Sequence, residues 1–411
     1  MPFKLDHPRF VALLIGIFAQ ALFSWQLAVP HLLVFDEVHY VPAARTLLAL
    51  AEPRNVEHPM LGKELIALGM MLFGDNPVGW RALSTLAGTA TVMGAFAILW
   101  LMYDRLRTAT LGALMVLLNF TVFVQARIAM LDGFMAALVV CGTAVLLWAM
   151  RGEEGQARRR WLAGSVLLGL AAGAKWTAAP YVAFAGIAFL VARRGHSERW
   201  PGLGAVTGLV LLGAGSIGAY LLTFLPAFFY AHEPLTLATL LPFQLHMLQE
   251  QSQVLPPHTY QSDWTGWVLM KRPIWYLYEQ ADGAQRGILF LGNPAIMWSG
   301  LMAVLACLWA SARDRDGKAG VVAAIWLASW LMWAPVLKSP TFFYYYYLSS
   351  IWLPLVIAAA IDHWRDKLRY WDEAFLLAAA ILFVRFYPIL AATELAGPDA
   401  FRRWTWFRSW V

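Results

Sequence analysis

Long apolar stretches divide this chain, and most of them approach the length that crosses a lipid bilayer. A membrane-spanning helix needs about 20 mostly apolar residues, because the hydrocarbon core is about 30 Å thick and a helix rises 1.5 Å per residue. The stretches predict eleven helices, over 10–29, 80–102, 109–125, 132–150, 161–174, 177–192, 201–227, 294–311, 319–337, 342–361 and 373–391.

Composition supports a single-domain, all-α polytopic membrane protein. Of 411 residues, 60% are hydrophobic and only 14% are charged, whereas soluble domains carry about a quarter charged residues. The net charge of +6 comes from short basic clusters between apolar runs, so we expect no nucleic-acid partner.

The two cysteines, Cys141 and Cys307, lie inside apolar runs and predict neither a disulfide framework nor a thiolate metal site. The first run has no clear cleavage site, which predicts a retained first membrane helix.

Basic residues mark alternate connections between the predicted helices. They fall at 105–107, 151–160, 193–199, 313–318 and 365–369, and loops rich in Lys and Arg face the cytoplasm. The two long segments, 31–79 and 228–293, are therefore predicted on the outer face. Within the first, residues 41–51 predict a short amphipathic helix along the interface.

Two adjacent acids, Asp36 and Glu37, stand where the chain leaves the first predicted helix. Charged side chains at a membrane edge are costly unless they face water or take part in chemistry, so they are functional candidates. The alternative is a solvated loop acid. Downstream, His58 is a candidate polar contact. Lys63 falls in the first turn of a helix expected from Gly62, where it either binds a phosphate or reaches toward the lipid headgroups.

Three more candidates sit at predicted outer turns between helices. Arg127 and Asp132 either contact a substrate or form a structural ion pair between helix ends. Lys175 interrupts an apolar stretch, so it either reaches toward the headgroups or points into a cavity.

The second outer segment interleaves polar residues with aromatic ones. His258, Tyr260 and Arg272 are its candidates, because an arginine between aromatic rings can bind phosphate through its fork of donors. An interfacial anchor or a packed lid are the alternatives. No His and acidic residues have a metal-ligand spacing, and no glycine-rich phosphate loop precedes a helix.

The strings Phe-Asp-Glu-Val-His-Tyr at 35–40 and His-Pro-Met-Leu-Gly-Lys at 58–63 resemble the first-loop signature of protein O-mannosyltransferases. These are glycosyltransferases of the GT-C fold that use polyprenyl-phosphate sugars. Segments 127–132, 173–177, 258–293 and 342–347 are similar to further elements of the family, so the resemblance covers nearly the whole chain. Met60 departs from it, since the family usually has a second proline there. Eukaryotic members carry a soluble domain for which 228–293 leaves no room, so the chain resembles a compact bacterial member.

The resemblance implies an inverting transfer of mannose from polyprenyl-phosphate-mannose to a Ser or Thr hydroxyl of a translocated protein. It places the reaction on the outer, periplasmic face of a bacterial inner membrane, among membrane lipids. Asp36 would be the general base, and Glu37 would orient the acceptor or pair with Arg127. The candidates to stabilise the leaving phosphate are Lys63 and Arg272, then Arg127 and Lys175.

No cofactor is required by this scheme, and a divalent metal stays open. A GT-C transferase that moves a sugar such as aminoarabinose to lipid A, or to another envelope glycolipid, is the main alternative. A transporter or lipid-binding scaffold is the third, but transporters more typically place their charges near the bilayer midplane.

Overall fold

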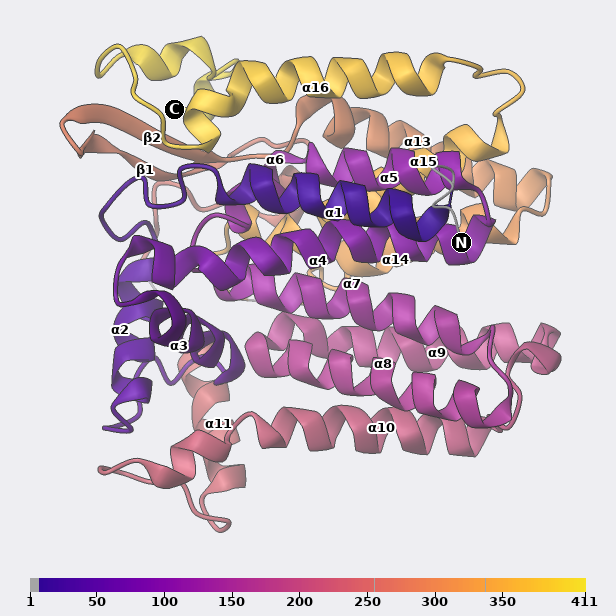
Figure 1. Ribbon diagram of the computed structural model, residues 1–411, viewed down its shortest axis with the longest axis horizontal. Coiled ribbons are helices and arrows are strands. Elements are labelled where there is room, and N and C mark those ends of the chain that lie inside the picture. Colours follow the sequence, from indigo (N-terminus) through magenta and orange to yellow (C-terminus); the bar gives the residue numbers. More distant parts are fainter. Residues whose placement is uncertain (1–6, 255, 337) are drawn as a thin grey trace.

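The computed structural model describes residues 7–254, 256–336 and 338–411, and its long helices run side by side (Figure 1). The bundle consists of α1 (Pro8–Ser24), α4 (Pro77–Tyr103), α5 (Leu106–Leu117), α6 (Phe120–Gln125), α7 (Leu131–Ala149), α8 (Glu154–Ala174), α9 (Ala179–Gly195), α10 (Ala205–Leu222), α13 (Pro294–Arg313), α14 (Gly317–Leu331), α15 (Tyr347–His363) and α16 (Trp371–Leu390). Within the described residues, seven helical stretches are long and apolar enough to cross a membrane, and α1, α5 and α14 are shorter apolar helices. The prediction of a helical, multi-pass membrane protein is confirmed.

Each predicted helical segment overlaps an observed helix, and the largest differences in extent concern three segments. The segment 109–125 is interrupted between α5 and α6, where Asn119 caps the second helix. Helix α8 begins at Glu154, before the predicted 161, because its charged first turns extend past the apolar part; Arg158 pairs there with Glu154 at 2.9 Å. Helix α14 ends at Leu331, and the predicted end at 337 lies outside the described residues.

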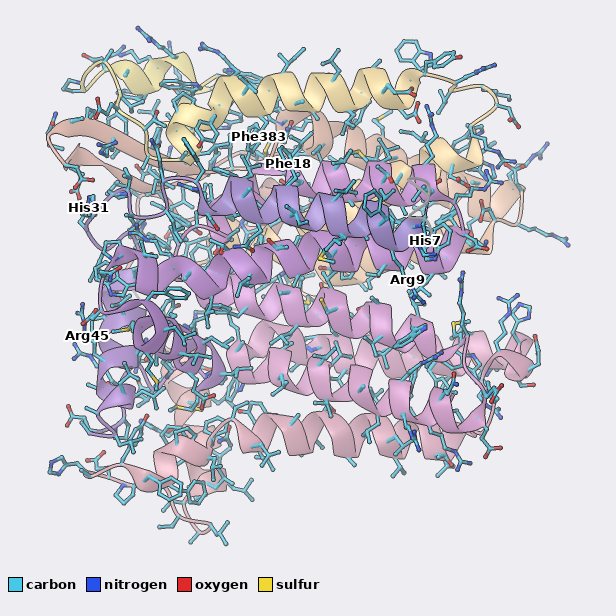
Figure 2. The ribbon with its side chains drawn as sticks, in the orientation of Figure 1. His7, Arg9, Phe18, His31, Arg45 and Phe383 are labelled. Atoms are coloured by element: carbon cyan, nitrogen blue, oxygen red, sulfur yellow. The ribbon has the colours of Figure 1, made fainter. Side chains whose placement is uncertain are left out.

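One end of the bundle carries the shorter elements, and we call it the Asp36 end. These elements are α2 (Glu37–Leu48), α3 (Leu61–Phe73), α11 (Leu240–Gln251), α12 (Trp264–Trp267), β1 (Ile274–Ala281) and β2 (Ala284–Phe290). Figure 2 shows His31 and Arg45 at this end and His7 and Arg9 at the other. Helix α2 covers the predicted amphipathic segment but begins directly after Asp36, and α3 carries Lys63 in its first turn as predicted.

The antiparallel hairpin of β1 and β2 is a small addition to the helical fold that the sequence analysis did not predict. Ala281 pairs with Ala284, so Asp282 and Gly283 form a two-residue turn, with φ of 51° and 77°. Such turns need positive φ at both positions, which Asp-Gly tolerates well. That dipeptide between two aromatic and aliphatic runs was the sequence signal for the hairpin.

Burial is greatest along α15, which packs against α5, α13 and α14. The apolar stretch 343–363 is 83% buried, whereas 176–195, which contains α9, is only 22% buried. A helix that is apolar all round is either buried in protein or faces lipid. Short 3-10 turns connect the helices at Trp176–Ala178, Ser197–Arg199, Leu225–Phe229, Phe343–Tyr346, Ala400–Arg403 and Arg408–Trp410.

Candidate active site

The two adjacent acids at the start of α2 have opposite environments. Glu37 is fully buried, and its carboxylate accepts two hydrogen bonds from the Arg81 guanidinium, Nε at 2.9 Å and Nη2 at 2.8 Å. The backbone N–H groups of Val34 and Ala129 donate to the same carboxylate, each at 2.8 Å. The expected pairing of Glu37 with Arg127 is therefore wrong, because both oxygens are already occupied.

Arg81 was missed at the sequence level. Its guanidinium also donates to the backbone oxygens of Leu27, Pro30 and Leu32, at 3.3, 2.8 and 2.8 Å. These bonds tie the connection after α1 to α4. A basic residue at the start of an otherwise apolar helix was the signal that could have identified it.

Asp36, in contrast, is partly exposed. In the part of the chain that the structure describes, its side chain has a single hydrogen bond, from Tyr40 Oη to Asp36 Oδ2 at 3.3 Å. Burial raises the pKa of Asp36 to about 6, and the positive charge of Lys175 is the strongest opposing influence. A carboxylate with a pKa near neutrality and an uncommitted oxygen is suited to accept a proton at physiological pH.

Aromatic stacking fixes the backbone next to Asp36. The Phe35 ring stacks on Tyr276 of β1 with centroids 4.1 Å apart, and Tyr276 stacks on Phe290 of β2 at 5.0 Å. Phe35 has a φ of 50°, which is uncommon for a residue with a bulky side chain. The hairpin thus holds a strained residue in place and sets the position of the neighbouring carboxylate.

Asp132 and Lys175 form a buried ion pair beside this acid. Lys175 Nζ donates to both Asp132 oxygens, at 2.9 and 2.7 Å, and lies 5.2 Å from the centre of the Tyr344 ring. The lysine is 5% exposed, so it points inward rather than toward the headgroups. The expected ion pair between Arg127 and Asp132 is not formed, since Asp132 is paired with Lys175.

Arg127 closes the end of α1 instead of facing a substrate. Its guanidinium donates to the backbone oxygens of Phe23, Trp25 and Gln26, at 2.8, 2.6 and 3.3 Å. These oxygens lie in the last turn of α1 or directly after it, where carbonyl groups lack partners within the helix. The geometry supports a structural role for Arg127 and not the expected contact with phosphate.

Lys63 is likewise saturated by backbone oxygens. Its Nζ donates to Arg54, Asn55 and His58, at 3.3, 2.8 and 2.9 Å, and the side chain is 2% exposed. Burial lowers the pKa of Lys63 to about 8. An ammonium group has three protons to donate, so none is left for a ligand. The first-ranked phosphate contact is therefore corrected: Lys63 organises the loop before α3.

Arg272 also uses its donors on backbone oxygens. Nη1 reaches Ser409 at 2.7 Å and Val411 at 2.8 Å, while Nε and Nη2 reach Thr259 at 3.2 and 3.0 Å. The guanidinium lies 5.1 Å from the centre of the Tyr260 ring. Its main contacts join Thr259, in the segment 228–293, to residues 409–411, so the geometry does not support the expected role in phosphate binding.

The two histidine candidates differ in their surroundings. His58 packs edge-on against Tyr40, with centroids 5.7 Å apart, and its Nδ1 is 2.9 Å from Gln251 Nε2. Burial lowers the pKa of His58 well below its usual value, which favours the neutral ring. His258 is exposed, accepts from the Tyr260 N–H and packs against Phe342. His58 thus joins the Asp36 cluster, while His258 and Tyr260 belong to the group around Arg272.

Lys338 is a cation that sequence reasoning did not single out. Among the described residues its Nζ makes one long hydrogen bond, 3.4 Å to Gln251 Oε1, and it lies 5.9 Å from the centre of the Tyr345 ring. Burial lowers the pKa of Lys338, and the charge of Lys175 lowers it further. A lysine directly before the Ser-Pro step into α15 was the available sequence signal, and the structure shows it half-buried. Unlike Lys63, it keeps protons free for a ligand.

Metal-type ligands do not gather here. Within residues 7–254, 256–336 and 338–411, no group of three or more His, Cys, Asp or Glu side chains could hold a metal ion.

Known families match most of the chain. Residues 57–215 match the family described as dolichyl-phosphate-mannose-protein mannosyltransferase, and residues 236–410 match the C-terminal four TMM region of protein-O-mannosyltransferase. This chain belongs to the protein O-mannosyltransferase family. A family member from Mycobacterium tuberculosis, a polyprenol-phosphate-mannose--protein mannosyltransferase, is 28% identical over 76% of this chain and 72% of its own length.

Solved structures place the fold in the GT-C class. A chain of the Saccharomyces cerevisiae protein O-mannosyltransferase Pmt1-Pmt2 complex superposes with a TM-score of 0.83 over 100% of this chain and 93% of its own, at 13% identity. ArnT from Cupriavidus metallidurans, solved with undecaprenyl phosphate, gives a TM-score of 0.60 over 91% and 69%, at 15% identity. At these identities the likeness concerns the fold, which protein O-mannosyltransferases share with ArnT.

Proposed function

We propose that this enzyme transfers mannose from a polyprenyl-phosphate carrier to a Ser or Thr hydroxyl of a protein, with Asp36 as the general base. The observation that carries the proposal is the contrast between the two acids at the start of α2. Glu37 is buried and fully hydrogen-bonded, whereas Asp36 is partly exposed and has one long hydrogen bond. Family membership supports the donor and the protein acceptor.

In the proposed reaction the acceptor oxygen attacks the anomeric carbon of mannose while its proton passes to Asp36. The bond between that carbon and the phosphate oxygen breaks, and polyprenyl phosphate leaves with the bonding electrons. Attack from the side opposite the phosphate inverts the configuration. A carboxylate must come within about 3 Å of the hydroxyl to accept the proton, and it must be ionised. The raised pKa of Asp36, about 6, leaves it ionised at neutral pH while making it a stronger base than an ordinary aspartate.

The leaving phosphate needs positive charge rather than a proton. We assign this role first to Lys338, which has free donors, and then to Lys175, whose charge already reaches Asp36 from its pair with Asp132. Fixed cations at a departing phosphate lower the barrier because they are in place before charge develops. His58 and Tyr40 lie beside the base and are proposed to contact the sugar or the acceptor. This scheme requires no cofactor.

We place the Asp36 end on the outer, periplasmic face of a bacterial inner membrane. The basic loops 105–107, 151–160, 193–199, 313–318 and 365–369 connect helices at the opposite end of the bundle (Figure 1). Loops rich in Lys and Arg stay in the cytoplasm, which supports this orientation.

A second candidate is transfer of a sugar to an envelope glycolipid. The fold likeness to ArnT, which was solved with undecaprenyl phosphate, is the observation that favours it. Both reactions would use the same base and the same class of lipid donor, so only the acceptor separates them.

The test is an in vitro transfer assay with purified protein, polyprenyl-phosphate-mannose and a Ser/Thr-rich peptide. Wild type should mannosylate the peptide, and Asp36→Asn should lose about 100-fold to 10,000-fold in rate, the usual contribution of a general base. Substantial turnover by Asp36→Asn would refute the base assignment. Consumption of donor only when lipid A replaces the peptide would favour the second candidate.

A further inference from the structure

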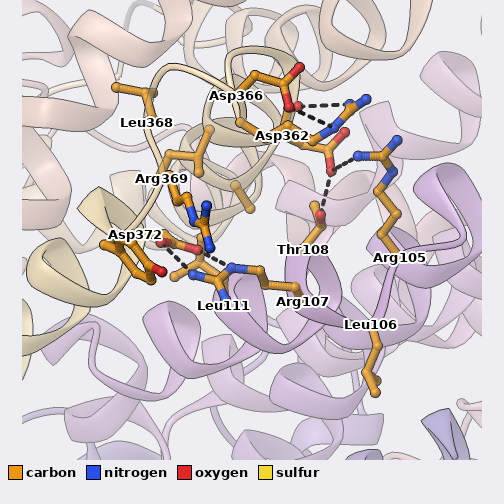
Figure 3. Close-up of a pocket in the computed structure, with 14 residues that line it drawn as sticks. Arg105, Leu106, Arg107, Thr108, Leu111, Asp362, Asp366, Leu368, Arg369 and Asp372 are labelled. Carbon is orange, nitrogen blue, oxygen red and sulfur yellow. Dashed lines mark hydrogen bonds and ion pairs between the residues drawn. The ribbon is translucent and has the colours of Figure 1, made fainter. Parts of the chain in front are cut away.

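The end of the bundle opposite Asp36 contains a cavity of about 580 Å³ between α5, α15 and the start of α16 (Figure 3). This volume lies within the range of small-molecule and headgroup sites. Its apolar wall is formed by Leu106, Leu111, Ala358, Ile361 and Leu368. Its basic residues are Arg105, Arg107, Arg365 and Arg369. Figure 3 shows Arg105 on one side and Arg107 with Arg369 on the other.

The carboxylates in the lining are already engaged or turned outward. Asp372 accepts from Arg107 Nε at 2.5 Å, and Arg107 also contacts Glu373. Asp362 accepts from Thr108 Oγ1 at 2.5 Å. Asp366 is 93% exposed, and its carboxylate is 4.0 Å from Arg365 Nε.

Two guanidinium groups have few hydrogen-bond or ion-pair partners among the described residues. Arg369 has no hydrogen bond or ion pair with any described residue, and its guanidinium lies 4.9 Å from the centre of the Tyr370 ring. Arg365 has only the 4.0 Å contact with Asp366 and a 3.4 Å bond to the Asp362 backbone oxygen. Arg105 is nearly as free, with one contact to Asp362 at 3.5 Å.

The backbone next to Arg369 has a strained conformation. Tyr370 has a φ of 69°, and α16 begins at the next residue. A non-glycine residue in the left-handed region costs of order 1–3 kcal/mol and persists only where the surrounding structure imposes it. The turn therefore sets the position of Arg369 in the cavity lining, where its side chain remains exposed and open to a ligand.

We propose that this cavity binds the phosphate headgroup of an anionic membrane lipid through Arg365 and Arg369. A guanidinium matches a phosphate because its parallel N–H donors can bind two oxygens at once. Basic pockets between membrane helices bind anionic headgroups in this manner, and the apolar wall formed by α5 and α15 provides a surface for the start of the acyl chains. The site lies at the far end of the bundle from Asp36, so it is independent of the proposed reaction.

The experiment is native mass spectrometry of the full-length protein in detergent, with phosphatidylglycerol, phosphatidylcholine or inorganic phosphate added. Wild type should retain phosphatidylglycerol in preference to zwitterionic phosphatidylcholine. Arg365→Gln and Arg369→Gln should each weaken phosphatidylglycerol binding by roughly tenfold, the size expected for one lost charge-assisted contact. Neither side chain holds another element in place strongly, so both variants should remain folded, which tryptophan fluorescence checks.

Arg159→Gln is the matched control, because Arg159 is exposed in the basic first turns of α8 at the same end and its loss changes the net charge equally. An equal loss of lipid in this control would overturn the proposal by showing that binding follows overall charge. Equal retention of the two phospholipids by wild type would also overturn it. Binding of inorganic phosphate at the same residues, without preference for the lipid, would refute the lipid assignment.

Discussion

The two neighbouring acids at the start of α2 can be separated by replacing each with its amide and measuring stability. Glu37→Gln keeps the shape of the side chain but exchanges one acceptor oxygen for an NH₂ group. Four donors converge on the native carboxylate, from the Arg81 guanidinium and from the N–H groups of Val34 and Ala129. The amide can accept from the donors on one side only, and it turns its own protons toward the others.

The magnitude follows from this count. Two hydrogen bonds are lost, and each bond to a charged group contributes about 1.5–3 kcal/mol. Arg81, which is 1% exposed, is also left without a counter-charge. Breaking a buried ion pair by removing one partner costs about 3–5 kcal/mol, which agrees with the sum of the lost bonds. We therefore expect Glu37→Gln to lower the free energy of unfolding by about 3–5 kcal/mol.

Asp36→Asn should raise the free energy of unfolding or leave it unchanged. Burial raises the pKa of Asp36 from 3.8 to about 6, so the folded state holds that proton more tightly than the unfolded state. Stability from this group is present below pH 3.8 and is lost as pH rises to 6. At pH 8 the wild type carries the unfavourable charge and Asp36→Asn does not, so the variant should be at least as stable.

The assay is unfolding in mixed micelles with increasing sodium dodecyl sulfate at pH 8, followed by tryptophan fluorescence. If the free energy of unfolding of Glu37→Gln lies within about 0.5 kcal/mol of the wild-type value, the Glu37–Arg81 pair does not contribute the stability assigned to it. If Asp36→Asn is as unstable as Glu37→Gln, the assignment of separate roles to the two acids is refuted.

Three further predictions concern the same end of the molecule. Because Asp36 must be ionised to act as a base, kcat/KM for transfer should rise with pH to about 6 and then level, and a flat profile from pH 5 to 8 would contradict this. Lys63→Met should leave three backbone oxygens unpaired, cost about 2–4 kcal/mol and expose the bond after Arg54 to trypsin, whereas unchanged digestion would contradict the structural role. Lys338→Gln should lower kcat/KM for the lipid donor about tenfold and leave the free energy of unfolding unchanged. Arg272→Gln should instead lower the free energy of unfolding with little change in the KM for the donor. The reverse pattern in steady-state kinetics and unfolding measurements would restore Arg272 as the phosphate contact.

Much of the bundle was predictable because apolar length is a property of local sequence. The helices at 80–102, 132–150 and 294–311 agree with α4, α7 and α13 within a few residues. The position of Asp36 in the connection after the first helix followed from the same reasoning. The hairpin was missed because the segment 228–293 was considered for its candidate site residues and not for strands, although its Asp-Gly turn was visible.

The sequence did not predict which charged side chains are paired and which remain unpaired, because pairing depends on partners far away in the sequence. Glu37 and Asp36 are neighbours, but only Glu37 meets Arg81, 44 positions later. Lys63 had the composition of a phosphate contact, and only the folded loop before it reveals that backbone oxygens consume its protons. A sequence identifies charged groups, whereas the fold decides which of them remain unpaired.

The stack of Phe35 on Tyr276 has a consequence for biosynthesis. Residues 35 and 276 are separated by more than half of the chain, so a nascent protein displays its acid pair long before the hairpin exists. Until β1 and β2 emerge, Phe35 lacks the ring that holds its strained backbone, and Lys338 arrives later still. Proteins are synthesised from the N-terminus at about 5–20 residues per second, so the proposed base waits for roughly 10 to 50 seconds before the hairpin has been made. An enzyme built in this way cannot act on its donor before its own synthesis is nearly complete.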